Sequence, residues 1–169
     1  MALIATPGTA DANSYLTVAE ADAYFAERLY SEAWGAASNE NKEAALIMAT
    51  GLLDSSYVWS GSATTPDQTL AWPRTGMKLY GQTIASDVIP RLVKKATAEI
   101  ALYLLGNNPL AVGDTDNISK VKAGPVEVQF KDSAKITVLP SNILSFIPIG
   151  WVIVDDPDDT SFEAIFKVL

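Results

Sequence analysis

The spacing of apolar side chains predicts three amphipathic helices in the first two thirds of the chain. The first helix should cover about residues 18–29. Thr17 and Glu20 have the form of a capping box at its start, in which each side chain bonds the backbone of the other residue. Apolar or small side chains then recur every three or four positions, at Val18, Ala21, Phe25 and Leu29.

Two further helices are predicted from the same kind of pattern. The second should cover about residues 41–55 after a cap at Ser38 or Asn39, with an inner stripe of Ala45, Met48, Ala49 and Leu52. The third should have Pro90 as its first residue and end near Gly106, with a buried stripe of Val93, Ala96, Ile100 and Leu104. Three amphipathic helices of this length can close one small core.

The segment between the second and third helices, residues 57–89, has no regular hydrophobic period. Glycine and proline interrupt it repeatedly, at Gly61, Pro66, Pro73, Gly76 and Gly81. A loop of more than 30 residues without regular structure is unusual in a compact domain and is generally functional. We therefore expect this loop to carry part of the functional surface.

After the third helix the pattern changes to that of a strand. Residues 126–130 alternate between apolar and polar, and residues 135–139 are the expected return strand of a hairpin. A two-stranded hairpin is marginal alone in water, so it needs a helix or a neighbouring subunit beneath it. Ser141 should then cap a short helix that extends to Phe146.

The last part of the chain is rich in apolar side chains around an acidic turn, which predicts docking onto its own core or onto a partner. The residues expected to dock are Trp151, Phe162, Ile165 and Phe166. The predicted fold is mainly α: a small bundle of about three core helices plus short helices, with a C-terminal two-stranded β-hairpin and an extended arm. Residues 1–110 should form the helical body with the 57–89 loop, and residues 111–169 the hairpin and docking arm.

The composition removes several classes of function. Of the 169 residues, 49% are hydrophobic and 19% charged, as in folded domains. The absence of cysteine and histidine excludes disulfides, the usual zinc sites and the commonest general base. No apolar stretch reaches the roughly 20 residues of a membrane-spanning helix, and the start lacks the pattern of a secretory signal. We expect a soluble protein made in a cytoplasm.

Few residues suggest catalysis or ligand binding. The acidic run at residues 155–159 could bind a hard cation, but it lacks the ligand order of a calcium loop and is more typical of a solvated turn. Ser119 and Lys122 fit the loose S-x-x-K form of some hydrolases without its companion motifs. Phosphate-cradling and dinucleotide-binding glycine motifs are absent. We therefore expect no enzymatic activity, no cofactor and no metal.

The strongest candidate for a contact surface is the sequence Trp72, Pro73 and Arg74 in the long loop. Pro73 fixes its own φ and restricts Trp72 to an extended conformation, so the indole and the guanidinium should leave the backbone at set angles. Tryptophan and arginine are the residues most enriched at binding hot spots. Alternatively, Trp72 pins the loop to the helices.

The other three tryptophans have different expected roles. Trp34 and Trp59 should complete the core near helix ends, as large amphipathic rings do. Trp151 could belong either to the core or to a partner contact.

A local excess of positive charge follows the Trp-Pro-Arg sequence. Between residues 74 and 95, Asp87 is the one acidic residue against five basic ones: Arg74, Lys78, Arg91, Lys94 and Lys95. This cluster could contact another subunit, be ordinary solvated helix charge, or contact DNA. The formal net charge of −8 argues against a protein whose outer surface grips nucleic acid, because such binding depends on cations that displace counterions from phosphates. It suits a surface past which DNA slides.

The order of several short motifs resembles a phage protein family. These motifs are NSYLT at 13–17, EADAYF at 20–25, AALI at 44–47 with Ala49, Thr50 and Asp54, and LAWPR at 70–74 with Gly76, Ile89 and Pro90. Members of the family are labelled DnaT-like single-stranded-DNA-binding proteins, and they are similar to head-to-tail adaptor, or head-completion, proteins of tailed phages. The resemblance covers about residues 13–105.

The resemblance implies a structural virion protein located at the head-tail junction and made in the host cytoplasm. Its partners would be its own copies in a ring of about twelve, the portal protein, and a tail-side or head-closure protein. Double-stranded DNA would pass through the ring without sequence-specific binding. The alternative that the family label implies is a single-stranded-DNA-binding replication factor.

Overall fold

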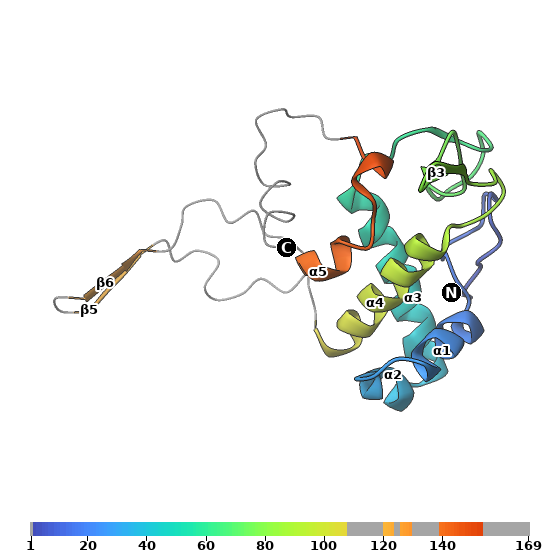
Figure 1. Cartoon of the computed structure of the whole chain (residues 1–169). Helices are drawn as coiled ribbons and strands as arrows, with labels where there is room; N and C mark the ends of the chain where they lie inside the picture. The colour runs from blue at the N-terminus through green and yellow to red at the C-terminus, as the bar shows by residue number, and fades with distance from the viewer. Residues whose placement is uncertain (1, 108–119, 124–125, 130–138, 154–169) are drawn as a thin grey trace.

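The computed structural model describes residues 2–107, 120–123, 126–129 and 139–153 (Figure 1). The helices in chain order are α1 (Val18–Ala26), α2 (Glu32–Ala36), α3 (Asn39–Ser56), α4 (Arg91–Gly106), α5 (Ser141–Leu144) and the 3-10 turn η1 (Ile149–Trp151). Within these ranges the strands form three separate two-stranded antiparallel pairs. The fold is therefore mainly α with small hairpins, as the sequence predicts.

α3 and α4 form the centre of the body, with α1 and α2 at its lower end in Figure 1. Small side chains such as Ala49 and Ala96 are fully buried and let the two helix backbones approach closely. The larger buried side chains on these two helices are Leu46, Leu53, Val93 and Ile100. α4 begins one residue later than predicted, because Pro90 keeps an extended ψ of 144° and serves as the cap.

The capping box at the start of α1 is present as predicted. The Thr17 side chain accepts a hydrogen bond from the Glu20 backbone, and the Glu20 carboxylate accepts one from the Thr17 backbone at 2.8 Å. The predicted end of this helix is wrong, because α1 stops at Ala26 and Leu29 is 78% exposed. The Ser31 hydroxyl donates to the backbone oxygen of Phe25, which satisfies a carbonyl at the end of the helix.

An ion pair between the partly exposed Arg28, just after α1, and the buried Glu99 ties the end of α1 to α4. Arg28 donates to both carboxylate oxygens of Glu99, at 2.6 and 2.8 Å, and Tyr24 donates its hydroxyl to the same carboxylate. Glu99 is only 8% exposed, so removing Arg28 would leave a buried charge without its counter-ion.

α2 is a short helix that the sequence pattern does not predict. Its five residues are too few to show a hydrophobic period. Trp34 is its buried side chain and packs on Phe25 with ring centroids 4.8 Å apart, while its indole N–H donates to Asp22 at 2.7 Å. The expectation that Trp34 belongs to the core is confirmed.

The 57–89 segment contains regular structure, in contrast to the expected irregular loop. β1 (Ser62–Ala63) pairs with β2 (Arg74–Thr75), and β3 (Lys78–Leu79) pairs with β4 (Gln82–Thr83). Tyr80 and Gly81 join β3 to β4 with φ angles of 51° and 81°, the left-handed conformation that two-residue hairpin turns require. These strands are two residues long, too short for an alternating pattern to reveal them.

The C-terminal hairpin joins the first predicted strand to a segment on its N-terminal side. β6 (Val126–Gln129) matches the first predicted strand, but it pairs with β5 (Lys120–Ala123), which precedes it. Residues 135–138 of the predicted return strand lie outside the described residues. No helix within the described ranges is long and apolar enough to cross a membrane.

Residues 139–153 dock onto the helical body. Leu139, Ile143, Ile147 and Trp151 are all buried in the same core as α3 and α4. Backbone hydrogen bonds from Ser60 to Trp151 and from Ile153 to Val58, at 2.9 and 2.7 Å, hold this segment beside the start of the long loop. The predicted docking of Trp151 therefore occurs on its own chain. Phe162, Ile165 and Phe166 lie outside the described residues, and the division near residue 110 stays a prediction.

Candidate functional site

Trp72 lies at the centre of three packed tryptophans. Its ring centroid is 5.6 Å from that of Trp59 and 5.2 Å from that of Trp151, and the first pair is T-shaped with an interplanar angle of 80°. Trp72 is 1% exposed. The indole N–H groups of Trp59 and Trp72 are buried and have no hydrogen-bond partner in the described part of the chain.

Arg74 is committed to the backbone of its own loop. Its guanidinium donates to the carbonyl oxygens of Ser60 at 2.6 Å, Ala71 at 3.0 Å, Trp59 at 3.1 Å and Gly61 at 3.0 Å. Four of its five N–H donors are therefore used internally. Burial lowers the pKa of Arg74 from its ordinary value, against the opposing effect of Tyr15 and Asp54 nearby.

A second polar group fixes the same turn to α3. The Tyr15 hydroxyl donates to the Asp54 carboxylate and accepts from the Trp72 backbone N–H at 3.2 Å, while Asp54 also accepts from the Ala71 backbone N–H at 2.9 Å. Burial raises the pKa of Asp54, although the hydrogen bonds from Ala71 and Tyr15 oppose it. Burial also raises the pKa of the Tyr15 hydroxyl. Tyr15 and Asp54 thus hold the turn on the helical body.

These contacts correct the expected placement of the Trp-Pro-Arg sequence. Trp72 and Pro73 are buried in the core of their own chain, so neither is an exposed contact for a partner. The physical reason is that Trp59 and the docked Trp151 both pack against Trp72, and that Arg74 bonds backbone carbonyls of its own loop. The alternative expectation, that Trp72 pins the loop to the helices, agrees with this packing. Arg74 is half-buried.

The predicted basic cluster does not form one free patch. Lys94 forms an ion pair with Glu20, and the Lys95 ammonium lies 4.3 Å from the centroid of the Phe146 ring. Lys78 and Arg91 are exposed and form no ion pair with any described residue. Of the five basic residues that the sequence groups together, only these two present their charge without a partner in the described part of the chain.

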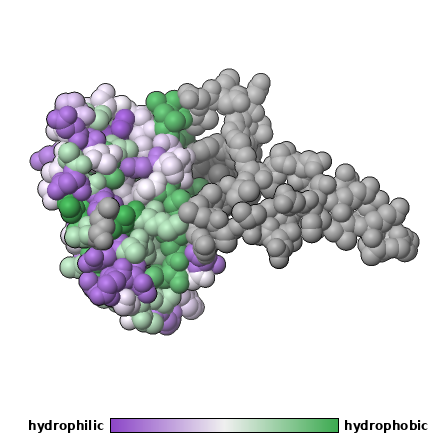
Figure 2. Space-filling view, turned by 180° about the vertical axis from the view of Figure 1, so that it is seen from behind, coloured by the Kyte–Doolittle hydropathy of each residue, from purple (hydrophilic) through white to green (hydrophobic). Residues whose placement is uncertain are grey.

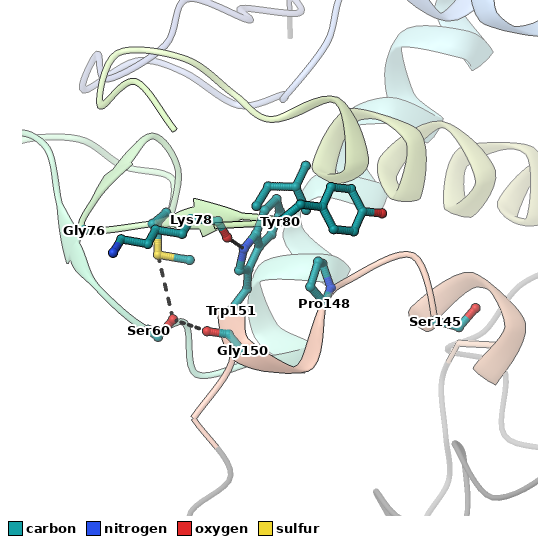
Figure 3. A pocket seen from close by; sticks show the side chains of 10 residues that line it. Ser60, Gly76, Lys78, Tyr80, Ser145, Pro148, Gly150 and Trp151 are labelled. Atoms are coloured by element: carbon teal, nitrogen blue, oxygen red, sulfur yellow. Dashed lines mark hydrogen bonds between the residues drawn. The ribbon is translucent and has the colours of Figure 1, made fainter. Parts of the chain in front are cut away.

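A groove of about 620 Å³ lies beside the tryptophans, between the β3–β4 hairpin and η1 (Figure 3). Its residues are Ser60, Gly76, Met77, Lys78, Leu79, Tyr80, Ser145, Pro148, Gly150 and Trp151. Trp151 donates its indole N–H to the Lys78 carbonyl at 2.7 Å, and Ser60 donates its hydroxyl to the Gly150 carbonyl at 3.0 Å, as Figure 3 shows. The groove is therefore assembled from two segments far apart in the sequence.

Sequence reasoning identifies Lys78 and Trp151 but misses the other groove residues. Tyr80 is 87% exposed at the tip of the β3–β4 hairpin. The Tyr80 and Gly81 pair between two short polar-apolar segments is the sequence signal that could have indicated a hairpin here. No signal places Ser145 or Gly150 next to it, because that contact depends on docking of the C-terminal segment.

A second groove, with acidic residues among those that line it, is found on α3. This groove has a volume of about 620 Å³ and is lined by Ala2, Glu40, Glu43, Ala44, Ile47 and Met48.

Figure 2 shows hydrophilic side chains over much of one face of the body, with hydrophobic side chains gathered on the side next to the grey residues. Within the described ranges no group of acidic side chains is arranged to hold a metal ion. The acidic run at residues 155–159 and Ser119 lie outside those ranges.

Comparison with known protein families gives a match over most of the chain. Residues 1–145 match the family described as "Putative DnaT-like ssDNA binding protein". No curated protein and no solved structure is similar enough to this chain to be matched. The match covers most of the chain, including the helical body and the Trp-Pro-Arg sequence. The resemblance to proteins labelled DnaT-like is confirmed: the chain belongs to the family of DnaT-like proteins.

Proposed function

We propose that this chain is a structural virion protein that forms a ring between the portal and the tail of a phage and lines the DNA channel. The order of motifs from Asn13 to Pro90, which resembles head-to-tail adaptor proteins, suggests this role. Its partners are further copies in a ring of about twelve, the portal protein, and a tail-side or head-closure protein.

The observation that carries the proposal is the internal use of basic side chains. Residues 2–107 contain seven lysines and arginines against eleven aspartates and glutamates. Five of the seven are engaged within the chain: Arg28 with Glu99, Lys42 with Asp22, Arg74 with carbonyls, Lys94 with Glu20, and Lys95 with Phe146. A surface that binds phosphates needs free cations. This acidic body is better suited to a wall past which DNA moves.

The β5–β6 hairpin supports assembly into an oligomer. Each strand has four residues, and a two-stranded hairpin is marginal alone in water. A neighbouring subunit or the portal would provide the surface that it needs. The proposed docking of Phe162, Ile165 and Phe166 onto the portal follows the same reasoning from apolar side chains.

Electron microscopy of the full chain, alone and mixed with the portal protein of the same phage, tests this function. We expect rings that close one end of the portal. A chain that stays monomeric and leaves the portal bare would contradict the proposal. The chain without residues 154–169 is the matched variant, and we expect it to lose attachment to the portal.

Single-stranded-DNA binding is the second candidate, because the family description names it. The β3–β4 hairpin presents an exposed aromatic ring, Tyr80, close in sequence to the exposed cation of Lys78, the combination that stacks bases and contacts phosphates. Fluorescence anisotropy with a labelled oligonucleotide would show binding that falls by orders of magnitude between about 50 and 200 mM salt. Undetectable binding at the lower salt removes this candidate. Equal binding by Tyr80→Ala would show that Tyr80 is not the ring that stacks on the bases.

A further inference from the structure

Leu29 and Tyr30 form an exposed apolar pair between α1 and α2. Leu29 is 78% and Tyr30 82% exposed, although both are large hydrophobic side chains. Tyrosine is one of the residues enriched among the anchors that dominate protein interfaces. We call this pair the knob.

The backbone of the knob is held in place from the core. One nitrogen of Arg28 donates to the carbonyls of Leu29 at 2.6 Å and Tyr30 at 2.9 Å, while the rest of the guanidinium binds the buried Glu99. Tyr30 has a φ of 60°, a conformation that residues other than glycine rarely adopt. The surrounding structure must therefore maintain this conformation, which is a feature common at binding sites. The knob is presented by a rigid support.

A groove that could accept the knob lies at the other end of the body. The residues that line the groove beside Trp151 include the apolar Leu79 and Pro148, and they include Lys78, which has no acidic partner among the described residues. Figure 1 shows β3 at the end of the body opposite to α1 and α2. The knob and this groove therefore cannot meet within one chain.

The charges around the two surfaces are complementary. Glu27 and Glu32 flank the knob in sequence, are exposed, and form no ion pair with a described residue. They would approach Lys78 when the knob enters the groove beside Trp151. The second groove, on α3, carries Glu40 and Glu43 at its edge and would repel them. Charge thus selects the groove beside Trp151.

We infer that the knob of one copy of this chain inserts into the groove beside Trp151 of the next copy. Because the contact joins two different surfaces, it repeats from copy to copy, and it closes into a ring when the rotation between copies allows. This inference rests on the proposed ring and names the surfaces that build it.

Two variants each disrupt one of the two surfaces and leave the other intact. Tyr30→Asn removes the aromatic ring, and asparagine tolerates a positive φ, so the backbone is kept. Gly150→Glu places a carboxylate in the groove, where an added Cβ has no described atom within 4 Å. The matched controls are Tyr30→Phe, which keeps the ring, and Gly51→Glu, which makes the same change on an open part of α3.

Sedimentation velocity of each variant and of mixtures gives the test. We expect the unaltered chain and both controls to assemble, and Tyr30→Asn and Gly150→Glu each to remain monomeric. An equimolar mixture of these two variants retains one intact knob facing one intact groove, so it should form dimers and nothing larger.

Other results would overturn the inference in distinguishable ways. If both variants assemble like the unaltered chain, these surfaces are not the contact, while the proposed ring stands. If both are monomeric but their mixture forms no dimer, the knob and the groove do not bind each other. If the unaltered chain is monomeric at every concentration, self-assembly itself fails, and the proposed ring with it.

Discussion

Arg74 organises the long loop as a single residue. Its planar guanidinium bonds carbonyl oxygens of two parts of the loop, residues 59–61 and Ala71, which a point charge on a flexible stem cannot do. The same side chain that looks like an interface anchor in the sequence is used to fix the loop. Its chemistry was correctly recognised, but its partner is the backbone of its own chain.

Arg74→Lys should destabilise the fold while leaving the loop sequence otherwise unchanged. Lysine would leave partly buried carbonyls of the loop without donors, and we expect the free energy of unfolding to fall by about 2 kcal/mol. Urea denaturation measures this loss. Arg91→Lys is the control, since Arg91 is exposed, and it should change the midpoint little. Equal midpoints for Arg74→Lys and the unaltered chain would contradict the internal role of Arg74.

Asp54 gives the fold a specific pH dependence. Because burial raises its pKa in the native state, native Asp54 holds a proton at pH values where unfolded Asp54 has lost it. The contribution of this group to the free energy of unfolding therefore falls as the pH rises from the ordinary aspartate pKa through the raised one. Asp54→Asn should remove this slope, as measured by denaturation across a pH series. An unchanged slope in the variant would show that other groups cause it.

At the scale of a secondary-structure element, the β1–β2 pair depends on Gly61. Its φ is 70°, and an added Cβ would lie 2.4 Å from the Thr75 carbonyl oxygen on the paired strand. We expect Gly61→Ala to lower the midpoint of thermal unfolding. Gly51→Ala in the open middle of α3 should instead add about 1 kcal/mol. Equal effects of the two substitutions would mean that the hairpin contributes little to stability.

The helices were predictable because their signals are local. Thr17 with Glu20, Ser38 and Pro90 mark helix starts within a few residues of the true ones. The sequence predicts too late an end for α1, because Leu29 continues the apolar spacing. In the structure α1 ends at Ala26, and Arg28 bonds Glu99 on α4 instead of continuing the helix. Such a long-range contact has no local signature.

The candidate site was less predictable for the same reason. The residue types at Trp72 and Arg74 indicate a contact surface. Trp72 is instead buried against Trp151, which lies far away in the sequence. The knob at Tyr30 and the groove at Gly150 carry no motif at all. They are visible only when exposure, φ and charge are considered together in three dimensions.

At the scale of the whole molecule, the internal use of basic side chains links the fold to the proposed function. The basic residues that the helical body contains mainly hold its own parts together, so its surface is left acidic. Such a surface should bind copies of itself through apolar contacts and a few free charges, and it should bind nucleic acid weakly.

Native mass spectrometry of the full chain with a single-stranded oligonucleotide measures both properties at once. We predict particles at multiples of 18.0 kDa that carry no oligonucleotide. A single 18.0 kDa chain bound to the oligonucleotide would contradict the proposed ring and favour the single-stranded-DNA-binding alternative.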